Sequence, residues 1–283
     1  MSDNRRRRTM ISVVVLTYNR LPLVRRCVED VLLRTSEKTR EIIIWNNGSD
    51  DGTREYLDGL LDPRIRVVHS PENIGMNAYA RAFDLATQDY LVELDDDVIE
   101  APASWDETLL DAFLRLPGIG YLAASLVDDP NDSQARYMMY LREERNAYTR
   151  KKVNGVTISE GPTAGICTMT SRELYERAGG FRQNTKFVFW HEDAEYVKAL
   201  KRLGYGSAVL EGLNVWHAGG VYYSKPNPAK NPFHQHHARV NARKDFVKRM
   251  ILRVPFAAAL NTRHNWFDPP HRYEPPIFGK DRS

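Results

Sequence analysis

Hydrophobic and polar positions alternate in short blocks along roughly the first hundred residues of the chain. Four apolar runs are typical of buried strands: residues 12–16, 41–45, 65–68 and 90–94. Three segments between them repeat apolar residues at helical spacing: residues 22–32, 53–61 and 76–86. Strands that alternate with helices in this way predict an α/β fold, in which helices flank a Rossmann-like, mainly parallel sheet.

The pattern from there to about residue 224 is less regular. It predicts helices over residues 104–116 and 190–203, a strand over 121–127, a hairpin around Asn154-Gly155, and a helix that ends at Gly179-Gly180. A capping-box pattern at residues 170–173 opens the helix that ends at the paired glycines. This part of the chain therefore continues the α/β domain with shorter and more varied elements.

The C-terminal segment is basic. From Lys225 onward it has twelve Lys or Arg residues against four Asp or Glu, whereas the whole chain carries a net charge of only +3. Residues 226–232 are linker-like, and residues 237–260 predict a basic amphipathic helix that Pro255 weakens. Such a helix fits an anionic membrane surface, a homodimer contact or a lid over a neighbouring site, and it also fits a solvated basic face.

Polar clusters follow three of the predicted strands, at Tyr18-Asn19, Asn46–Asp51 and Asp95–Asp97. The carboxyl ends of parallel strands share one edge of the sheet, where ligands bind. Three adjacent carboxylates repel one another unless a cation lies beside them, and extended backbone points Asp95 and Asp97 to the same side. The triplet therefore predicts a Mg²⁺ or Mn²⁺ site that shares its ion with substrate phosphates.

Two motifs in the second half also suit a chemical role. Glu192-Asp193 opens a predicted helix, directly after the aromatic run Phe187–Trp190. One of the two carboxylates suits a helix-dipole partner, and one desolvated by aromatic neighbours suits a general base. His217 precedes two glycines that allow close backbone approach, so it is a candidate Mn²⁺ ligand, although a lone histidine is more often structural.

The composition is typical of a globular protein without a membrane-spanning segment or a disulfide framework. With 283 residues, of which 42% are hydrophobic and 27% charged, the chain has an ordinary globular composition and no apolar run of membrane-spanning length. Arg5–Arg8 and the apolar run after them imitate a signal peptide, but no small-residue cleavage site follows. Two cysteines, Cys27 and Cys167, exclude a disulfide framework. We therefore expect a reducing, cytoplasmic location.

The order of these motifs resembles family 2 of the GT-A fold glycosyltransferases, which are inverting enzymes that use nucleotide-sugar donors. The resemblance is carried by Val13–Arg20, Asn46–Thr53, Asn73-x-Gly75 with Ala80-Arg81, Asp95–Asp97, Ala178–Phe181, Trp190–Tyr196 and Trp216-His217. It covers about residues 11–220. The segment from Trp190 to Tyr196 is nearest to the galactofuranosyl- and rhamnosyl-transferase branches.

The resemblance implies a domain organisation. A GT-A domain occupies residues 11–224, with a nucleotide-binding half at about residues 11–100 and an acceptor half at about 101–224. A basic tail at residues 1–10 precedes it, and a basic, proline-containing helical extension at residues 225–283 follows it. The acceptor half is the more variable half in this fold, so the acceptor cannot be read from it.

The resemblance also implies the roles of individual residues. Asp193 matches the catalytic base. Asp95 and Asp97 match the metal-binding Asp-x-Asp motif, and His217 matches the residue that completes the metal site in some members. Donor binding is implied for Thr17, Tyr18, Asn19, Asn47, Arg81, Asp95 and Asp96. The wall between donor and acceptor is implied for Thr163, Ala164, Gly165, Trp190 and Glu192.

The implied reaction moves a sugar from a nucleoside diphosphate to a hydroxyl group of a glycan, a polysaccharide or a lipid-linked acceptor. UDP or dTDP is the favoured donor nucleotide. One departure from the family pattern leaves the nucleobase of the donor undecided. Asn46-Asn47 stands where the family often has aspartate, and an asparagine can donate as well as accept a hydrogen bond. The acceptor and the linkage are not predicted.

Three other functions stay open at this point. A nucleotidyltransferase that makes nucleotide sugars also needs acidic metal ligands, but it usually has a basic, glycine-rich loop where this chain has Thr17–Arg20. A non-catalytic nucleotide- or carbohydrate-binding protein leaves Asp193 and the aspartate triplet unexplained. Nucleic-acid binding has only the basic tails to support it, without a recognisable module, so we expect no nucleic-acid partner.

The helix at residues 237–260 suits either a homodimer contact or peripheral contact with the inner face of a membrane.

Overall fold

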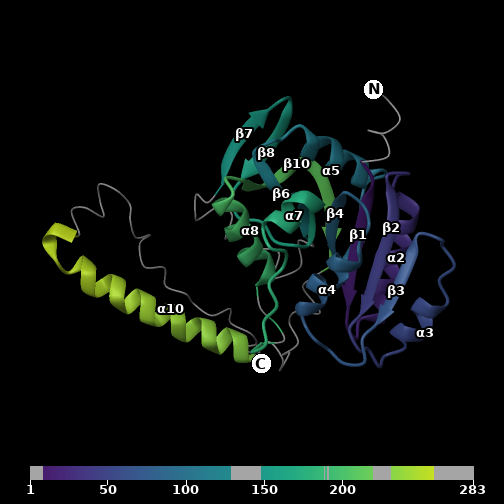
Figure 1. Ribbon diagram of the computed structural model, residues 1–283, viewed down its shortest axis with the longest axis horizontal. Coiled ribbons are helices and arrows are strands. Elements are labelled where there is room, and N and C mark those ends of the chain that lie inside the picture. The colour runs from purple at the N-terminus through teal and green to yellow at the C-terminus, as the bar shows by residue number, and fades with distance from the viewer. Residues whose placement is uncertain (1–8, 129–147, 188, 190, 219–230, 258–283) are drawn as a thin grey trace, which may run out of the picture. The chain divides into compact units, whose positions relative to one another are not determined.

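The computed structural model describes residues 9–128, 148–187, 189, 191–218 and 231–257 (Figure 1). The chain divides into two units, residues 1–223 and 224–283. Trp190 and residues 129–147 lie outside the described residues.

The first half of the sheet follows the predicted strands. Its four strands are parallel and lie in the order β3-β2-β1-β4. They are β1 (Ile11–Thr17), β2 (Thr39–Asn46), β3 (Ile65–His69) and β4 (Tyr90–Asp95). The helices between them are α2 (Leu21–Arg34), α3 (Thr53–Asp58) and α4 (Asn77–Leu85). The apolar residues of β1 from Ile11 to Val15 are fully buried, because helices cover both faces of this part of the sheet.

The second half extends the same sheet with strands of both directions. β9 (Cys167–Ser171) lies between β4 and β6 (Ile119–Asp128) and is antiparallel to both. β10 (Gly206–His217) runs parallel to β6. The remaining strands are β8 (Val156–Glu160), β7 (Thr149–Val153) and β5 (Val98–Glu100). The described residues thus form a ten-stranded, mainly parallel sheet, which confirms the predicted fold class.

Two groups of helices cover the sheet. α4, α7 (Arg172–Arg177) and α8 (Glu192–Arg202) share one face (Figure 1). An aromatic cluster joins them, formed by Tyr79, Phe83, Tyr175, Phe181 and Tyr196. α5 (Trp105–Leu114) is linked by hydrogen bonds to the end of α2 and to the residues after it. The helices therefore position the strand ends from both sides of the sheet.

Two predictions for the second half are wrong. The capping box does not form, because Thr170 belongs to β9 and its hydroxyl pairs with that of Tyr196 at 2.7 Å. Ser171 caps α7 instead, accepting a hydrogen bond from the N–H of Leu174. The next helix begins at Glu192 rather than at Trp190. The pairing of β9 with β4 and β6, which is distant in sequence, places Thr170 in a strand and leaves Ser171 to cap α7.

The second unit contains α10 (Asn231–Leu252). This helix begins six residues before the predicted start at residue 237, and it takes in part of the predicted linker. Pro232 stands in its first turn, where the absence of a backbone N–H costs little. The helix ends at Leu252 rather than at residue 260, because the residues before Pro255 disfavour helical backbone. The basic helical extension is thus present over different residues.

The parallel strands bring their carboxyl ends to one edge of the sheet. Thr17 at the end of β1 pairs with Asn46 at the end of β2, and Leu16 pairs with Asp95 of β4. On the other side, Val98 of β5 pairs with His217 at the end of β10. The predicted convergence of the polar clusters on one edge is therefore confirmed.

The link between α2 and α5 yields a stability prediction. Asp106 is fully buried and accepts hydrogen bonds from the backbone and hydroxyl of Ser36 and from the hydroxyl of Thr39. Asp106→Ala should lower the free energy of unfolding by about 3 kcal/mol or more, because buried donors lose a charged acceptor. The control Asp111→Ala removes an exposed carboxylate from α5 and should cost less than about 1 kcal/mol. Equal losses in urea denaturation would contradict this account.

Candidate active site

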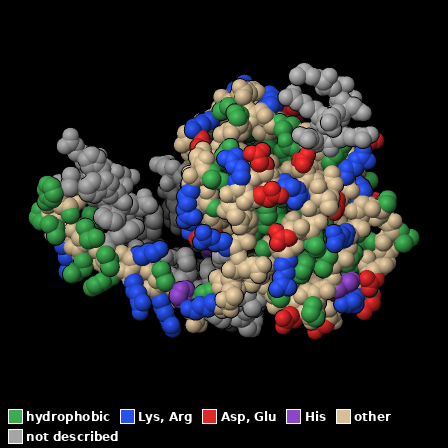
Figure 2. Space-filling model, viewed as in Figure 1, with side chains coloured by type: hydrophobic (Ala, Val, Ile, Leu, Met, Phe, Trp, Pro, Cys, Tyr) green, Lys and Arg blue, Asp and Glu red, His purple; other side chains and the backbone are tan. Residues whose placement is uncertain are grey.

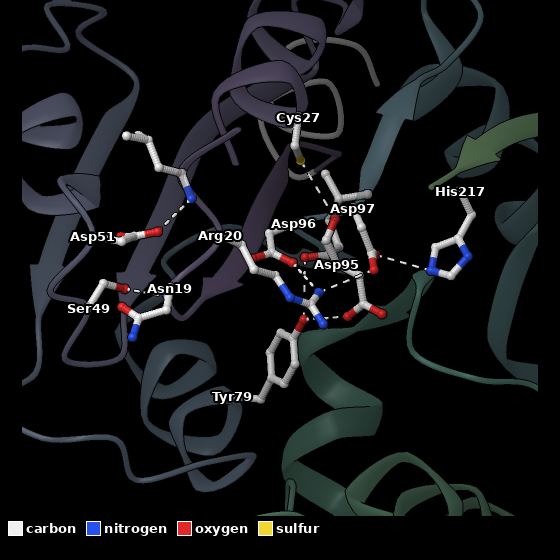
Figure 3. Close-up of polar contacts among 12 residues, drawn as sticks. Asn19, Arg20, Cys27, Ser49, Asp51, Tyr79, Asp95, Asp96, Asp97 and His217 are labelled. Atoms are coloured by element: carbon white, nitrogen blue, oxygen red, sulfur yellow. Dashed lines mark hydrogen bonds and ion pairs between the residues drawn. The ribbon is translucent and has the colours of Figure 1, made fainter. Parts of the chain in front are cut away.

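The aspartate triplet occupies the tight turn from β4 to β5 (Figure 3). Asp95 ends β4, and Asp96 and Asp97 form the turn. The pairing of β5 with β10 carries His217 to this turn, where its Nε2 lies 3.1 Å from Oδ1 of Asp97. The N–H of Ala218 donates to the carbonyl of Asp97 at 2.8 Å and holds the two segments together.

Asp95, Asp97 and His217 form a donor set suited to a divalent cation. Each offers one ligand atom, and these atoms lie within 4.8 Å of one another. Two carboxylate oxygens and one imidazole nitrogen match the ligand preference of Mn²⁺, and Mg²⁺ accepts the oxygens. The residues present therefore fit the metal that the sequence predicts.

The charges of the triplet are strongly coupled. Burial and the nearby Asp97 raise the pKa of Asp95 to about 7. Burial alone would raise the pKa of Asp97, but His217 and Arg20 outweigh it and lower that pKa. Burial also raises the pKa of Asp96 to about 6, although Arg20 opposes the shift. A bound divalent cation would relieve the repulsion that these shifts record.

Two residues that sequence analysis did not place in the site orient the triplet. Arg20 lies directly before α2, in the turn after β1, and its Nη1 lies 2.8 Å from Oδ1 of Asp96 and 3.2 Å from Oδ2 of Asp97 (Figure 3). The hydroxyl of Tyr79, on α4, donates to Oδ1 of Asp95 at 2.9 Å. Arg20 directly follows a polar strand end, which is a usable sequence signal. Tyr79 carries no such signal, because it also fits the buried face of α4.

The predicted donor residues at the other strand ends build a set of loops. Asn47 is buried, donates to Asn73 and to the carbonyl of Gly75, and accepts from the N–H of Ile74. Asn19, with a positive φ of 51°, joins the loop after β2: its N–H donates to Ser49, and its Oδ1 accepts from the N–H of Asp50. The side-chain amide of Asn47 thus holds residues 73–75 through hydrogen bonds.

The remaining predicted donor residues differ in exposure. Thr17 is buried at the end of β1, whereas Tyr18 beside it is 40% exposed. Arg81 is exposed on α4, and its neighbours Ala80 and Ala82 face the core. The role of these three side chains in donor binding stays a prediction.

Asp193 lies in the first turn of α8, near the triplet. Its Oδ1 accepts from the N–H of Ala194 at 2.6 Å, and its Oδ2 accepts from the N–H of Gly165 at 3.3 Å. The neighbouring carbonyl of Ile166 accepts from the N–H of Asp95 at 2.8 Å. Two consecutive residues of one loop thus connect Asp193 to the candidate metal ligand Asp95. Burial raises the pKa of Asp193, which favours its use as a base near neutral pH.

The other predicted wall residues are Thr163 and Ala164 in this loop, Glu192 next to Asp193, and Trp190. Glu192 is buried, and burial together with Asp193 raises its pKa well above the usual range. The carbonyl of Ala164 accepts from the hydroxyl of Thr168 at 2.6 Å. The hydroxyl oxygen of Thr163 is buried and forms no hydrogen bond with any residue that the structure describes. Trp190 lies outside those residues.

Glu93 is a further buried carboxylate that sequence analysis did not identify. It lies in β4, is 1% exposed, and accepts a hydrogen bond from the hydroxyl of Tyr121. Burial, followed by Glu192 and Asp193, raises its pKa well above the usual range. A charged residue within an apolar strand was the only signal for it in the sequence.

Solved structures with a similar fold have nucleotide and metal ligands. The mannosyltransferase PcManGT from Pyrobaculum calidifontis, in complex with GDP-Man and Mn²⁺, aligns with a TM-score of 0.55 and 22% identity, over 93% of this chain and 77% of that one. GalNAc-T7 with UDP, GalNAc and Mn²⁺ aligns with a TM-score of 0.57 and 16% identity, over 75% of this chain and 44% of that one. These likenesses establish the GT-A fold.

Sequence relatives match different shares of this chain. Uncharacterized protein y4gI of Sinorhizobium fredii is 22% identical over 267 residues, 88% of this chain and 28% of that protein. Glycosyltransferase GlyG of Streptococcus pneumoniae serotype 4 is 37% identical over 94 residues, 32% of this chain and 31% of that protein. The chain spans between 28% and 39% of the length of the curated relatives it matches. The profile described as Glycosyl transferase family 2 matches residues 12–179, more than half of the chain. The chain therefore belongs to glycosyl transferase family 2.

Proposed function

We propose that this protein is a metal-dependent, inverting glycosyltransferase that moves a sugar from a nucleoside diphosphate donor to a hydroxyl acceptor. The observation that carries the proposal is the short connection between two chemical groups. The metal-ligand set of Asp95, Asp97 and His217 and the carboxylate of Asp193 are joined through Gly165 and Ile166. Family membership and the GT-A fold support the same reaction class.

The residues divide the chemistry between them. Asp95, Asp97 and His217 would hold the metal, which acts as a Lewis acid and offsets the negative charge that grows on the leaving diphosphate. Asp193 would accept the proton of the acceptor hydroxyl. As that oxygen bonds to the anomeric carbon, the bond to the diphosphate oxygen breaks on the opposite face. Arg20 would hold Asp96 and Asp97 in place and limit their repulsion.

The identity of the donor is a narrower proposal. UDP or dTDP was the expected nucleotide, and the two similar structures were solved with GDP-Man and with UDP. The amide of Asn47 is already hydrogen-bonded to residues 73–75. The backbone of that loop is therefore a better candidate than the Asn47 amide for recognising the nucleobase of the donor. We propose a glycan or lipid-linked acceptor, and the galactofuranosyl- or rhamnosyl-transferase assignment stays a prediction.

We also propose that α10 contacts an anionic membrane surface, at the inner face of a membrane. Its apolar side chains are exposed and repeat at helical spacing: Phe246, Val247, Met250 and Ile251, with Val254 and Phe256 beyond the helix. Figure 2 shows hydrophobic side chains gathered on α10 beside Lys and Arg side chains. Apolar residues flanked by basic ones are typical of interfacial helices. No described helix is long and apolar enough to cross a membrane.

The first prediction concerns the pH dependence of metal binding. Because burial and Asp97 raise the pKa of Asp95 to about 7, Mn²⁺ must displace a proton below that pH. The apparent Mn²⁺ affinity should therefore rise about tenfold per pH unit up to about pH 7 and level off above it. Calorimetry measures this dependence. Asp97→Asn should abolish binding and the exposed control Asp111→Asn should retain it; an affinity independent of pH would contradict the proposal.

The second prediction concerns the base. Asp193→Asn should lower kcat by about 10²–10⁴-fold and leave the KM of the donor nearly unchanged, because only proton transfer is lost. The control Glu195→Gln alters a carboxylate of α8 that pairs with Lys198, and it should retain activity. Steady-state kinetics and NMR of the product anomer provide the measurements. Full activity of Asp193→Asn, or a product with retained configuration, would contradict the assignment.

The third prediction concerns α10. The protein should sediment with vesicles of phosphatidylglycerol and phosphatidylcholine at low salt, and less with rising salt. Met250→Glu should weaken partitioning at least about tenfold, since burial of a methionine side chain contributes about 1.5–3 kcal/mol. Ala242→Glu adds the same charge outside the apolar stripe and should have a smaller effect. Equal effects of both variants, or a dimer that Met250→Glu dissociates, would contradict membrane contact.

A further inference from the structure

The contact between Gly165 and Glu93 is too close for any side chain at position 165. A Cβ atom built on Gly165 would lie less than 3.0 Å from all three heavy atoms of the Glu93 carboxyl group. The backbone of Gly165 is not in the left-handed region, so conformational freedom does not explain the glycine. The glycine is needed because the loop rests directly on the carboxyl group of Glu93.

The carboxyl group of Glu93 is itself held in place. Glu93 is 1% exposed, and Tyr121, on β6, is fully buried and donates its hydroxyl to the Glu93 carboxyl. The ring of Tyr121 packs edge-on against Tyr196 of α8, with centroids 5.4 Å apart. Tyr196 lies one turn after Asp193 on the same helix. The surface beneath Gly165 is therefore braced by the helix that carries Asp193.

The loop is anchored on both sides of Gly165 and contacts Asp193 through Gly165 itself. Asp95 donates its N–H to the carbonyl of Ile166, and Thr168 donates its hydroxyl to the carbonyl of Ala164. Between these anchors, the N–H of Gly165 points to Oδ2 of Asp193. The contact of Gly165 with the Glu93 carboxyl group therefore sets the position of the Gly165 N–H relative to Asp193.

We propose that Glu93 is a positioning residue for the reaction: its carboxyl group supports Gly165, whose N–H orients the Asp193 carboxylate toward the acceptor hydroxyl. The inference rests on the proposed role of Asp193 as the base. Glu93 touches neither donor nor acceptor in this account, so its loss should lower kcat and leave the KM of the donor unchanged. Displacement of a reacting group by about 1 Å can cost about 10²-fold in rate.

The test is a double-mutant cycle on the full-length protein. Gly165→Ala, Glu93→Ala and the double variant are assayed by release of nucleoside diphosphate from a panel of UDP-, dTDP- and GDP-sugars. Gly165→Ala should lower kcat at least about tenfold in the wild-type background and less than about threefold in the Glu93→Ala background, where the added methyl group has room. Gly118→Ala is the matched control, because a Cβ there meets nothing within 4 Å.

Two conservative variants separate positioning from general stability. Glu93→Gln keeps the shape and an acceptor for Tyr121, and it should retain kcat within about threefold. Tyr121→Phe removes the donated hydrogen bond and should lower kcat about three- to tenfold at unchanged donor KM. This variant decides the question if Glu93→Ala does not fold.

Several results would overturn the inference. They are a wild-type kcat in Glu93→Ala, equal losses from Gly165→Ala in both backgrounds, or a wild-type kcat in Tyr121→Phe. Asp193→Asn is measured in the same assay. If it is fully active, the proposed base is wrong; if it is inactive while Glu93→Ala is fully active, only the role of Glu93 is wrong.

Discussion

Repulsion among buried carboxylates is the constraint on which the carboxyl edge of this sheet depends. Asp95, Asp96 and Asp97 follow one another in a single turn, and burial raises the pKa of the first two. Arg20, in the turn between β1 and α2, and His217 of β10 reach the triplet from opposite sides and offset part of the charge. The strand order β1-β4 on one side and the β5–β10 pairing on the other are what bring these groups together. A divalent cation would complete the compensation, and its need for phosphate oxygens links the edge to a nucleotide donor.

At the same edge, a single loop separates two groups of acidic side chains. On one side lie the candidate metal ligands, and on the other lies Asp193, with burial raising its pKa. Residues 162–166 run between them and contact both through backbone groups. The loop contacts Asp193 through an N–H donor and Asp95 through a carbonyl acceptor, and neither backbone group changes charge. Under the proposed function, one carboxylate would act as a base while its neighbours act as ligands.

Local pattern predicted the first half of the fold and identified Asp95 and Asp97 as candidate metal ligands, a role that stays a prediction. Buried strands and their polar ends are short-range features, so the sequence predicts the edge and the Asp95/Asp97 pair. β9 was not predicted, since its residues become a strand through pairing with β4 and β6. Glu93 was missed for a related reason: its role depends on Tyr121 and Gly165, which are distant in sequence. The resemblance to a known family supplied His217, whose approach to Asp97 follows from long-range pairing.

Crystals grown with Mn²⁺ and UDP or GDP, measured at the manganese absorption edge, test the central claim most directly. The account predicts one anomalous peak bound by Asp95, Asp97 and His217, with the diphosphate oxygens completing the coordination and the Asp193 carboxylate facing the space beside them. A nucleotide bound away from the carboxyl edge, or a Mn²⁺ peak that these three side chains do not touch, would contradict it.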